Sequence, residues 1–292
     1  MTTTIPTPAH TTQHTVTQDE VSALRAAVRA ILPAPAPATA SGTHCAASPV
    51  HAFVLAHTLA DATVRELAAA EPEPVSVVHL GQDIRIERPV RPGEQITVTL
   101  DVLGARREPR GTRVAVRARL TGPDRTSHAE LLTSALLLGA STIEPFGQIP
   151  SPPAPAPLGE AGGTAHAEHR PTPEWIRGYA QASGDLNPIH LDALAARDAG
   201  FPTVIAHGMS VLALALEEIA DRYADGDITR IVAAGGRFSA PVAPGATLRV
   251  ELAPDAAPTL VRFTCRTPDG IAVKNGWAQL ALAAPLPDGH HD

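Results

Sequence analysis

The sequence predicts an α+β protein of two similar halves, each with one central helix wrapped by a long, curved antiparallel sheet. Three observations lead to this fold class. A Pro-, Ala- and Gly-rich segment divides the 292-residue chain near its middle, a short motif recurs in both halves, and one helix-like run is apolar nearly all round.

The dividing segment spans residues 148–170 and has five prolines in its first ten positions. Such a composition buries little apolar surface and tends to be extended. We therefore expect a linker between an N-terminal domain, residues 1–147, and a C-terminal domain, residues 171–292. The Thr-rich residues 1–18 and the Pro/Ala segment 33–43 are also expected to be disordered or linker-like.

The recurring motif is Arg-x-x-x-Pro-Val-x-Pro-Gly, which begins at Arg85 in the first half and at Arg237 in the second. The two copies lie 152 positions apart, and the same offset aligns Val98 with Val250. Each motif lies between strand-like runs, and its Pro-Gly pair is typical of a turn that reverses the chain. The repeat supports two domains of one design.

The order of elements repeats as well. A helix candidate at residues 50–70 precedes strand candidates at 75–87, 94–103, 112–120 and 129–138. A second helix candidate at residues 209–223 precedes strand candidates at 228–238, 247–252, 259–266 and 271–281. Strands that follow one another without intervening helices favour antiparallel meanders over a doubly wound α/β fold.

The helix candidate at residues 209–223 is the most informative element. In its first twelve residues only Ser210, Glu217 and Glu218 are polar, and a helix that is apolar nearly all round must be covered on most sides. A curved antiparallel sheet that wraps the helix provides this cover. This is the hot-dog architecture, and two copies in one chain make a double hot dog.

Composition limits the possible partners. The net charge is −7, with 30 acidic and 23 basic residues, and this argues against a general nucleic-acid binder, which needs a basic surface. Two distant cysteines and the lack of an apolar signal core in residues 1–18 lead us to expect no disulfide framework and a cytoplasmic location. The longest apolar stretch, residues 211–216, is too short for a membrane span, so no membrane partner is expected.

The residue types that carry chemistry are concentrated in the stretch Ser-Gly-Asp-x-Asn-Pro-x-His, which runs from Ser183 to His190. The pattern predicts a short helix over residues 173–182 and a second helix, capped by Asn187, that continues to about residue 199. Asp185 would then lie in the loop between them. His190 would lie in the first turn of the second helix, where the positive helix end favours a neutral imidazole.

A second motif, His-Gly-Met, begins the buried helix with Gly208 as its expected first residue. The Gly208 N–H would be one of the donors without an intrahelical acceptor, and such a donor can hold a carbonyl oxygen that gains negative charge. Glycine also lets a thioester approach the backbone, although it could serve close packing alone. His207 either orients the loop or caps the helix.

These two motifs resemble the signature of the MaoC-like dehydratase family, which includes the (R)-specific enoyl-CoA hydratases. The resemblance covers about residues 179–210, and the first half resembles the N-terminal hot dog of two-domain members. It implies that Asp185 and His190 are the catalytic pair, that Gly208 binds the oxyanion and that Asn187 orders the loop. Ser183 and His207 are further supporting candidates, and Ser183 bonds either the catalytic pair or, as favoured, only its own backbone.

The first half contains no counterpart of the Asp/His motif, so we expect one active site per chain, in the second half. The first half would shape the acyl tunnel. Its His44, Cys45, His51 and His57 match no metal site, and the histidines are expected to be solvated or core residues. No metal and no cofactor are expected.

The expected function is a hydro-lyase that reversibly hydrates trans-2-enoyl thioesters to (R)-3-hydroxyacyl thioesters. Hydration needs a group that takes a proton from water, a group that protonates C2, and a donor for the thioester oxygen. An aspartate, a histidine and a helix-end N–H provide all three. The partner would be an enoyl or 3-hydroxyacyl thioester of coenzyme A or of acyl carrier protein, as in fatty acid metabolism.

Two other functions remain open. One is a hot-dog acyl thioesterase, and the other is a non-catalytic subunit that binds acyl chains within a dehydratase complex. A monomer and a homodimer are both possible, because a double hot dog already contains the pairing that single hot dogs achieve by dimerising. Residues 85–125 contain ten arginines and five acidic residues. The arginines could bind the phosphates of coenzyme A or an acidic carrier protein. The favoured interpretation is that they form a solvated strand face.

Overall fold

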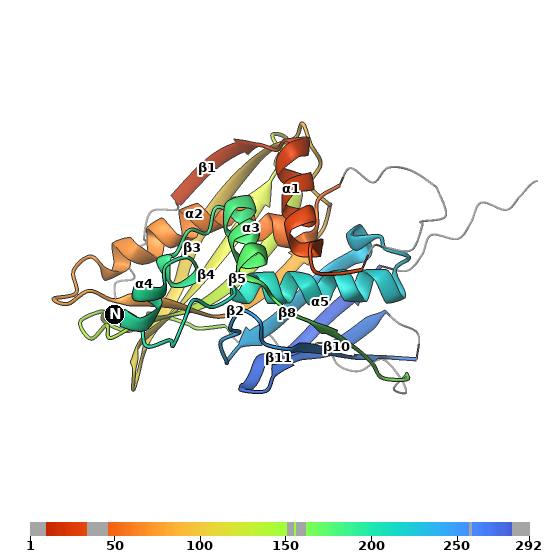
Figure 1. The fold of residues 1–292 in the computed structure, drawn as a ribbon. Coiled ribbons are helices and arrows are strands. Elements are labelled where there is room, and N and C mark those ends of the chain that lie inside the picture. The colour runs from red at the N-terminus through yellow and green to blue at the C-terminus, as the bar shows by residue number, and fades with distance from the viewer. Residues whose placement is uncertain (1–9, 34–45, 151–154, 156–161, 257–258, 282–292) are drawn as a thin grey trace, which may run out of the picture.

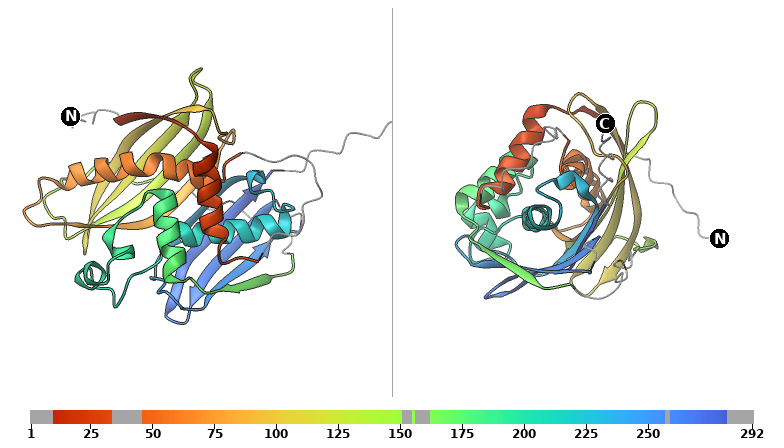
Figure 2. Two further views of the ribbon diagram at one scale, coloured as in Figure 1. Left: turned by 45° about the horizontal axis from the view of Figure 1, so that its top comes forward. Right: turned by 90° about the vertical axis from the view of Figure 1, so that its right-hand side faces the viewer.

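The computed structural model describes residues 10–33, 46–150, 155, 162–256 and 259–281. These residues form one continuous eleven-stranded sheet, in the order β1-β3-β4-β5-β2-β8-β11-β10-β9-β7, with β6 paired to β3. The sheet curves around the helices, and α5 is seen end-on inside the curve in Figure 2. The double hot-dog fold expected from the sequence is confirmed.

The first half begins with an edge strand and a short helix and continues with its central helix and a meander. Its elements are β1 (His10–Thr15), α1 (Gln18–Arg29), α2 (Pro49–Ala68), β2 (Ser76–Ile86), β3 (Gln95–Glu108), β4 (Gly111–Thr121), β5 (Ser127–Leu138) and the short β6 (Phe146–Gly147).

The second half repeats this plan with extra helical turns before its central helix (Figure 1). Its elements are β7 (Ala165–His169), α3 (Pro173–Ser183), a 3₁₀ turn (Pro188–His190), α4 (Ala193–Asp198), α5 (Gly208–Tyr223), a second 3₁₀ turn (Ile228–Arg230), β8 (Ile231–Phe238), β9 (Leu248–Pro254), β10 (Leu260–Thr267) and β11 (Gly270–Leu280). The helix and strand candidates of both meanders are therefore confirmed to within a few residues.

The junction of the halves is the antiparallel pairing of β2 with β8. Asp83 lies opposite Gly235 at the centre of this ladder. The offset of 152 that relates the two sequence motifs also carries Asp83 onto Gly235, so a residue pairs with its own repeat counterpart. A pseudo-two-fold axis therefore passes through the ladder, as it would at the interface of a symmetric dimer.

The core of the second half forms around α5, which is buried from Met209 to Ala220 as its composition predicts. Its polar residue Glu217 is only 3% exposed and pairs with two arginines of α1, at 3.1 Å from Arg25 Nε and 2.6 Å from Arg29 Nη1. A buried carboxylate needs such partners. The ion pairs therefore attach α1 of the first half to the central helix of the second.

Two short strands occur where the composition indicated disorder or a linker. β1 lies within residues 1–18, and β7 lies within the expected linker, residues 148–170. Both are edge strands held by main-chain pairing with β3 and β9, and β1 exposes most of its side chains. Neither therefore needs the apolar alternation by which buried strands are recognised. The remaining parts of these stretches, and most of segment 33–43, lie outside the described residues.

The helix α1 was also not anticipated. Thr17 caps it by accepting a hydrogen bond from the Glu20 N–H, and Thr172 caps α3 in the same way through the Trp175 N–H. Each helix follows the edge strand of its half, so the repeat extends beyond the meanders. No helix within the described residues is long and apolar enough to cross a membrane.

Replacing Glu217 with Ala should lower the free energy of unfolding by about 3 kcal/mol, because two partly buried arginines lose their common partner. Urea titration followed by circular dichroism measures the change. The control is Glu174→Ala, which removes an exposed ion pair with Arg177 and should leave stability nearly unchanged. Equal changes in the free energy of unfolding for the two substitutions would show that the ion pairs between α1 and α5 do not stabilise the fold.

Replacing Gly235 with Ala should lower the free energy of unfolding by about 1–3 kcal/mol. A Cβ there would collide with Asp83 Oδ1 and lie 2.8 Å from the Trp277 Nε1 atom. The control is Gly178→Ala in α3, where a Cβ meets nothing within 4 Å and the substitution should stabilise the helix by up to about 1 kcal/mol. Thermal denaturation of both variants tests the tight junction, and a tolerated Gly235→Ala would contradict it.

Candidate active site

The loop after α3 is folded by short bonds between side chains and backbone. α3 ends at Gly184 with a left-handed φ of 73°, which glycine adopts without steric cost. The Ser183 hydroxyl accepts the Asp185 N–H, Asp185 Oδ1 accepts the Asn187 N–H, and Asn187 Oδ1 accepts the Ile189 N–H, each at 3.3 Å. Ser183 and Asn187 thus shape the backbone on either side of Asp185.

His190 is the last residue of the 3₁₀ turn Pro188–His190, which Asn187 caps. The expected helix to residue 199 is interrupted at Leu191, and α4 begins only after a new cap, Asp192. His190 is therefore not in the first turn of an α-helix, and a turn of three residues has little helix dipole. Burial, and not a helix end, lowers the pKa of His190, against the opposing hydrogen bond to Ile205.

The tautomer of His190 follows from its hydrogen bond. Nδ1 lies 2.8 Å from the Ile205 carbonyl oxygen, and a carbonyl only accepts, so Nδ1 donates its hydrogen there. In the neutral ring Nε2 then keeps a free lone pair. The residue is 8% exposed, and its Nε2 is the atom available to take a proton.

His207 connects the Asp185 loop to the start of α5. Its Nε2 donates to the backbone carbonyl of Asp185 at 3.0 Å, and its ring stacks on His190 with centroids 3.7 Å apart and planes at 29°. Burial and the neighbouring His190 lower the pKa of His207 to about 4, so it is neutral near pH 7. Its side chain makes no capping hydrogen bond, which favours the loop-orienting alternative over the cap.

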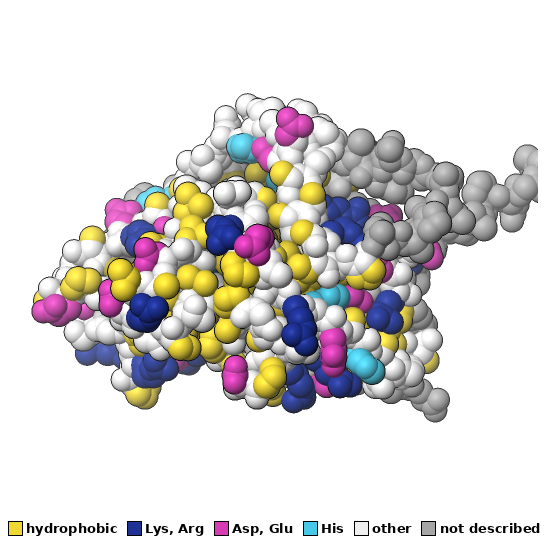
Figure 3. Space-filling model, viewed as in Figure 1, with side chains coloured by type: hydrophobic (Ala, Val, Ile, Leu, Met, Phe, Trp, Pro, Cys, Tyr) yellow, Lys and Arg dark blue, Asp and Glu magenta, His cyan; other side chains and the backbone are white. Residues whose placement is uncertain are grey.

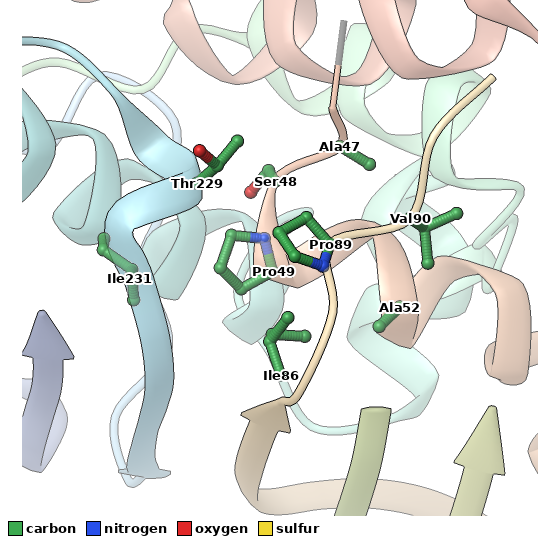
Figure 4. Close-up of a pocket in the computed structure, with 9 residues that line it drawn as sticks. All are labelled: Ala47, Ser48, Pro49, Ala52, Ile86, Pro89, Val90, Thr229 and Ile231. Carbon is green, nitrogen blue, oxygen red and sulfur yellow. The ribbon is translucent and has the colours of Figure 1, made fainter. Parts of the chain in front are cut away.

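Asp185, His190 and His207 each offer one potential ligand atom within 4.8 Å of the others. Two imidazoles that bind one ion direct their lone pairs at a common point, whereas these two rings lie nearly parallel and stacked. The cluster is better suited to proton transfer than to metal binding. The pocket in Figure 4 lies elsewhere, between the start of α2, Pro89 and Ile231, and includes none of the three residues.

Gly208 is the first residue of α5, as predicted, so its N–H belongs to the turn that lacks intrahelical acceptors. A Cβ at this position would lie 2.8 Å from the Phe238 ring. Close packing therefore requires glycine here. Its N–H lies at the start of α5, and the His207 hydrogen bond joins the Asp185 loop to this helix end.

The functional candidate that sequence reasoning missed is His57, from α2 of the first half. Its Nε2 lies 3.6 Å from Asp185 Oδ1, and each side chain is about one-fifth exposed, at 20% and 18%. The sequence interpretation as a solvated or core histidine is wrong in one respect, because His57 faces the site carboxylate. No motif or spacing relates the two positions, so only the tertiary structure brings them together.

The contact between Asp185 and His57 shifts the pKa of both side chains. Burial disfavours the charged form of each side chain, but the mutual contact outweighs it, so the pKa of Asp185 falls below its usual range and that of His57 rises. An aromatic series, formed by the rings of Phe53, His79 and Phe238, packs beside His57. The ring centroid of Phe53 lies 5.3 Å from that of His57 and 5.5 Å from that of His79. The His79 ring in turn meets the Phe238 ring edge-on, with centroids 4.9 Å apart.

Comparison with known proteins finds sequence similarity in the half of the chain that contains this site. Residues 158–257 match the model of the MaoC-like domain family. The chain is 45% identical over 84 residues to 3-hydroxyacyl-thioester dehydratase X of Mycobacterium tuberculosis, which covers 29% of this chain and 28% of that protein. It is 30% identical over 179 residues to 3-hydroxyacyl-thioester dehydratase Y of the same organism, which covers 60% and 61%. The matches thus span less than two thirds of these relatives.

Solved structures extend the similarity to the whole fold. A MaoC-like dehydratase from Phytophthora capsici superposes with a TM-score of 0.73 at 19% identity, over 95% of this chain and 97% of that one. A conserved hypothetical protein of Mycobacterium tuberculosis with a double hot-dog fold gives 0.61 at 15% identity, over 94% and 96%. The sequence match falls on the half that contains Asp185 and His190. Residues 158–257 are thus similar to a MaoC-like domain, and the whole chain has the double hot-dog fold.

Proposed function

We propose that the protein is a hydro-lyase that reversibly hydrates trans-2-enoyl thioesters to (R)-3-hydroxyacyl thioesters, with Asp185 and His190 as its acid/base pair. The observation that carries the proposal is the close approach of an ionised Asp185 and a neutral His190 whose Nε2 lone pair is free. Both groups can accept a hydrogen bond from one water molecule, and general acid/base catalysis needs such positioning.

In the hydration direction the oxygen of that water forms a bond to C3 while C2 receives a proton. One member of the pair takes the proton of the water and the pair delivers a proton to C2, so the site ends with the protons with which it began. The two groups titrate as a coupled unit, and the roles belong to the pair. The Gly208 N–H stabilises the thioester oxygen as negative charge develops on it.

The substrate is carried by coenzyme A or by acyl carrier protein, and the arginines of residues 85–125 give no reason to prefer either. Arg106 and Arg113 pair with Glu108, and Arg117 and Arg119 pair with Asp101. The four arginines share two carboxylates on the sheet surface, and these surface ion pairs support the solvated-face interpretation. A cytoplasmic location and either a monomer or a homodimer remain part of the proposal.

Replacing Asp185 with Asn, or His190 with Ala, should each reduce kcat/KM for a short enoyl-CoA at least about 100-fold, because each change removes one member of the pair. Loss of the conjugated enoyl absorbance measures hydration, and circular dichroism verifies the fold. Thiol release, followed with a disulfide dye, tests the thioesterase alternative. Full hydratase activity in both variants, or thiol release without hydration, would contradict the assignment.

Gly208→Ala should lower kcat/KM by about 10–100-fold, because a Cβ pressed against Phe238 moves the N–H from the thioester oxygen. Phe238→Leu makes room for the Cβ and serves as the second substitution. If Gly208 matters only for packing, the double variant should regain activity and stability together. If the thioester must approach the backbone, stability returns while activity stays low.

A further inference from the structure

The Asp185 side chain of the second half is in contact with His57 of the first half. His57 lies outside the Asp/His motif, so the motif does not account for this contact. Two groups contact Asp185 Oδ1: the Asn187 N–H from its own loop at 3.3 Å and His57 Nε2 from α2 at 3.6 Å. Among the described residues, no hydrogen-bond partner is found for Oδ2. One oxygen is thus held by protein groups, and the other is left for a reactant.

We propose that His57 is a positioning residue for Asp185, holding the carboxylate ionised and oriented from the opposite half of the molecule. The role rests on the proposed function, since it assigns His57 to the same site. At 3.6 Å the contact is too long for a hydrogen bond, and it is an ion pair when His57 is protonated. Such a pair in a partly buried site is stronger than on an open surface.

The charges around His57 favour this arrangement. On its own helix it faces Asp61, which stabilises its charged form, and Arg65, which opposes it. From β2 it is faced by His79, whose pKa burial and His57 lower to about 4. His57 is therefore the imidazole here whose pKa is raised rather than lowered.

The histidines of the site loop complete the surroundings. His190 and His207 also lie within the electrostatic range of Asp185, and their pKa values are both lowered. The carboxylate thus has one neighbour whose charged form is favoured, His57, and two whose neutral forms are favoured. This distribution leaves His190 free to act as a base while His57 compensates the buried negative charge.

The pH window of the pair follows from the two directions. The pKa of His57 is raised above 6.5, so the stabilisation is complete below that value and is lost as pH rises through the folded pKa. The pKa of Asp185 is lowered from 3.8, so its contribution is present above that value and is lost only in stronger acid. The pair therefore persists from mild acid to beyond the ordinary pKa of histidine.

The test is the pH profile of kcat/KM for crotonyl-CoA in the wild type, His57→Gln and His57→Leu. Loss of the cation should raise the pKa of Asp185 and also that of His190, which His57 lowers. Because protonation of His190 removes the base, the acid limb of the profile should move to higher pH by about one unit, a tenfold loss at the acid side. Glutamine places a neutral N–H donor near Oδ1, so it should retain more activity than leucine while showing the same shift. An unmoved acid limb in both variants overturns the proposal.

The matched control is His51→Gln on the same helix. His51 lies away from the site, and its Nε2 is 3.2 Å from Glu20 Oε1. This variant should leave the acid limb of the profile in place. A similar shift in His51→Gln would mean that the His57 effect comes from a general loosening of α2, and it would overturn the proposal. An NMR titration of His57 provides a readout independent of turnover. In Asp185→Asn its pKa should fall, and an unchanged value would overturn the pair. If the wild type hydrates no enoyl-CoA, the proposed function fails, while the titration still decides whether the pair exists.

Discussion

The arrangement of the whole molecule depends on the antiparallel ladder between β2 and β8. This ladder merges two curved sheets into one, and its register brings Asp83 opposite its repeat counterpart Gly235. A slip by one residue would turn every side chain of a strand to the other face. Arg237, which forms an ion pair with Asp83 at 2.9 Å, and the small residues around it fix that register. α2 consequently lies where one of its side chains can meet the loop after α3.

The two halves share a plan but differ in chemistry. Each has an edge strand, a Thr-capped helix and a central helix with a meander. In the second half the connection before the central helix contains Asp185 and His190. The first half contributes to the same place from its central helix, through His57 and the aromatic series that begins at Phe53. In the proposed enzyme one half contains the acid/base pair and the other compensates its charge.

Most of the fold could be predicted from the sequence because the meander strands and α5 are strongly apolar and the repeat motif fixes their correspondence. β1, β7 and α1 could not, since their stability comes from pairing with strands, or with Glu217, far away in the sequence. The loop residues could be identified because the motif is local. The contribution of His57 could not, because its meaning depends on a contact across the junction and not on its neighbours in sequence. The neutral state expected for His190 also has another cause, burial rather than a helix end.

The internal symmetry also determines which edges of the sheet stay open. β2 and β8 are paired with each other, so among the described strands the free borders of the sheet are β1 and β7. Both are short, with the sequences His-Thr-Thr-Gln-His-Thr and Ala-His-Ala-Glu-His. Brief polar borders of this kind resist the addition of further strands. Within the described residues, both ends of the sheet are therefore poor sites for fibril-like addition of strands from another molecule.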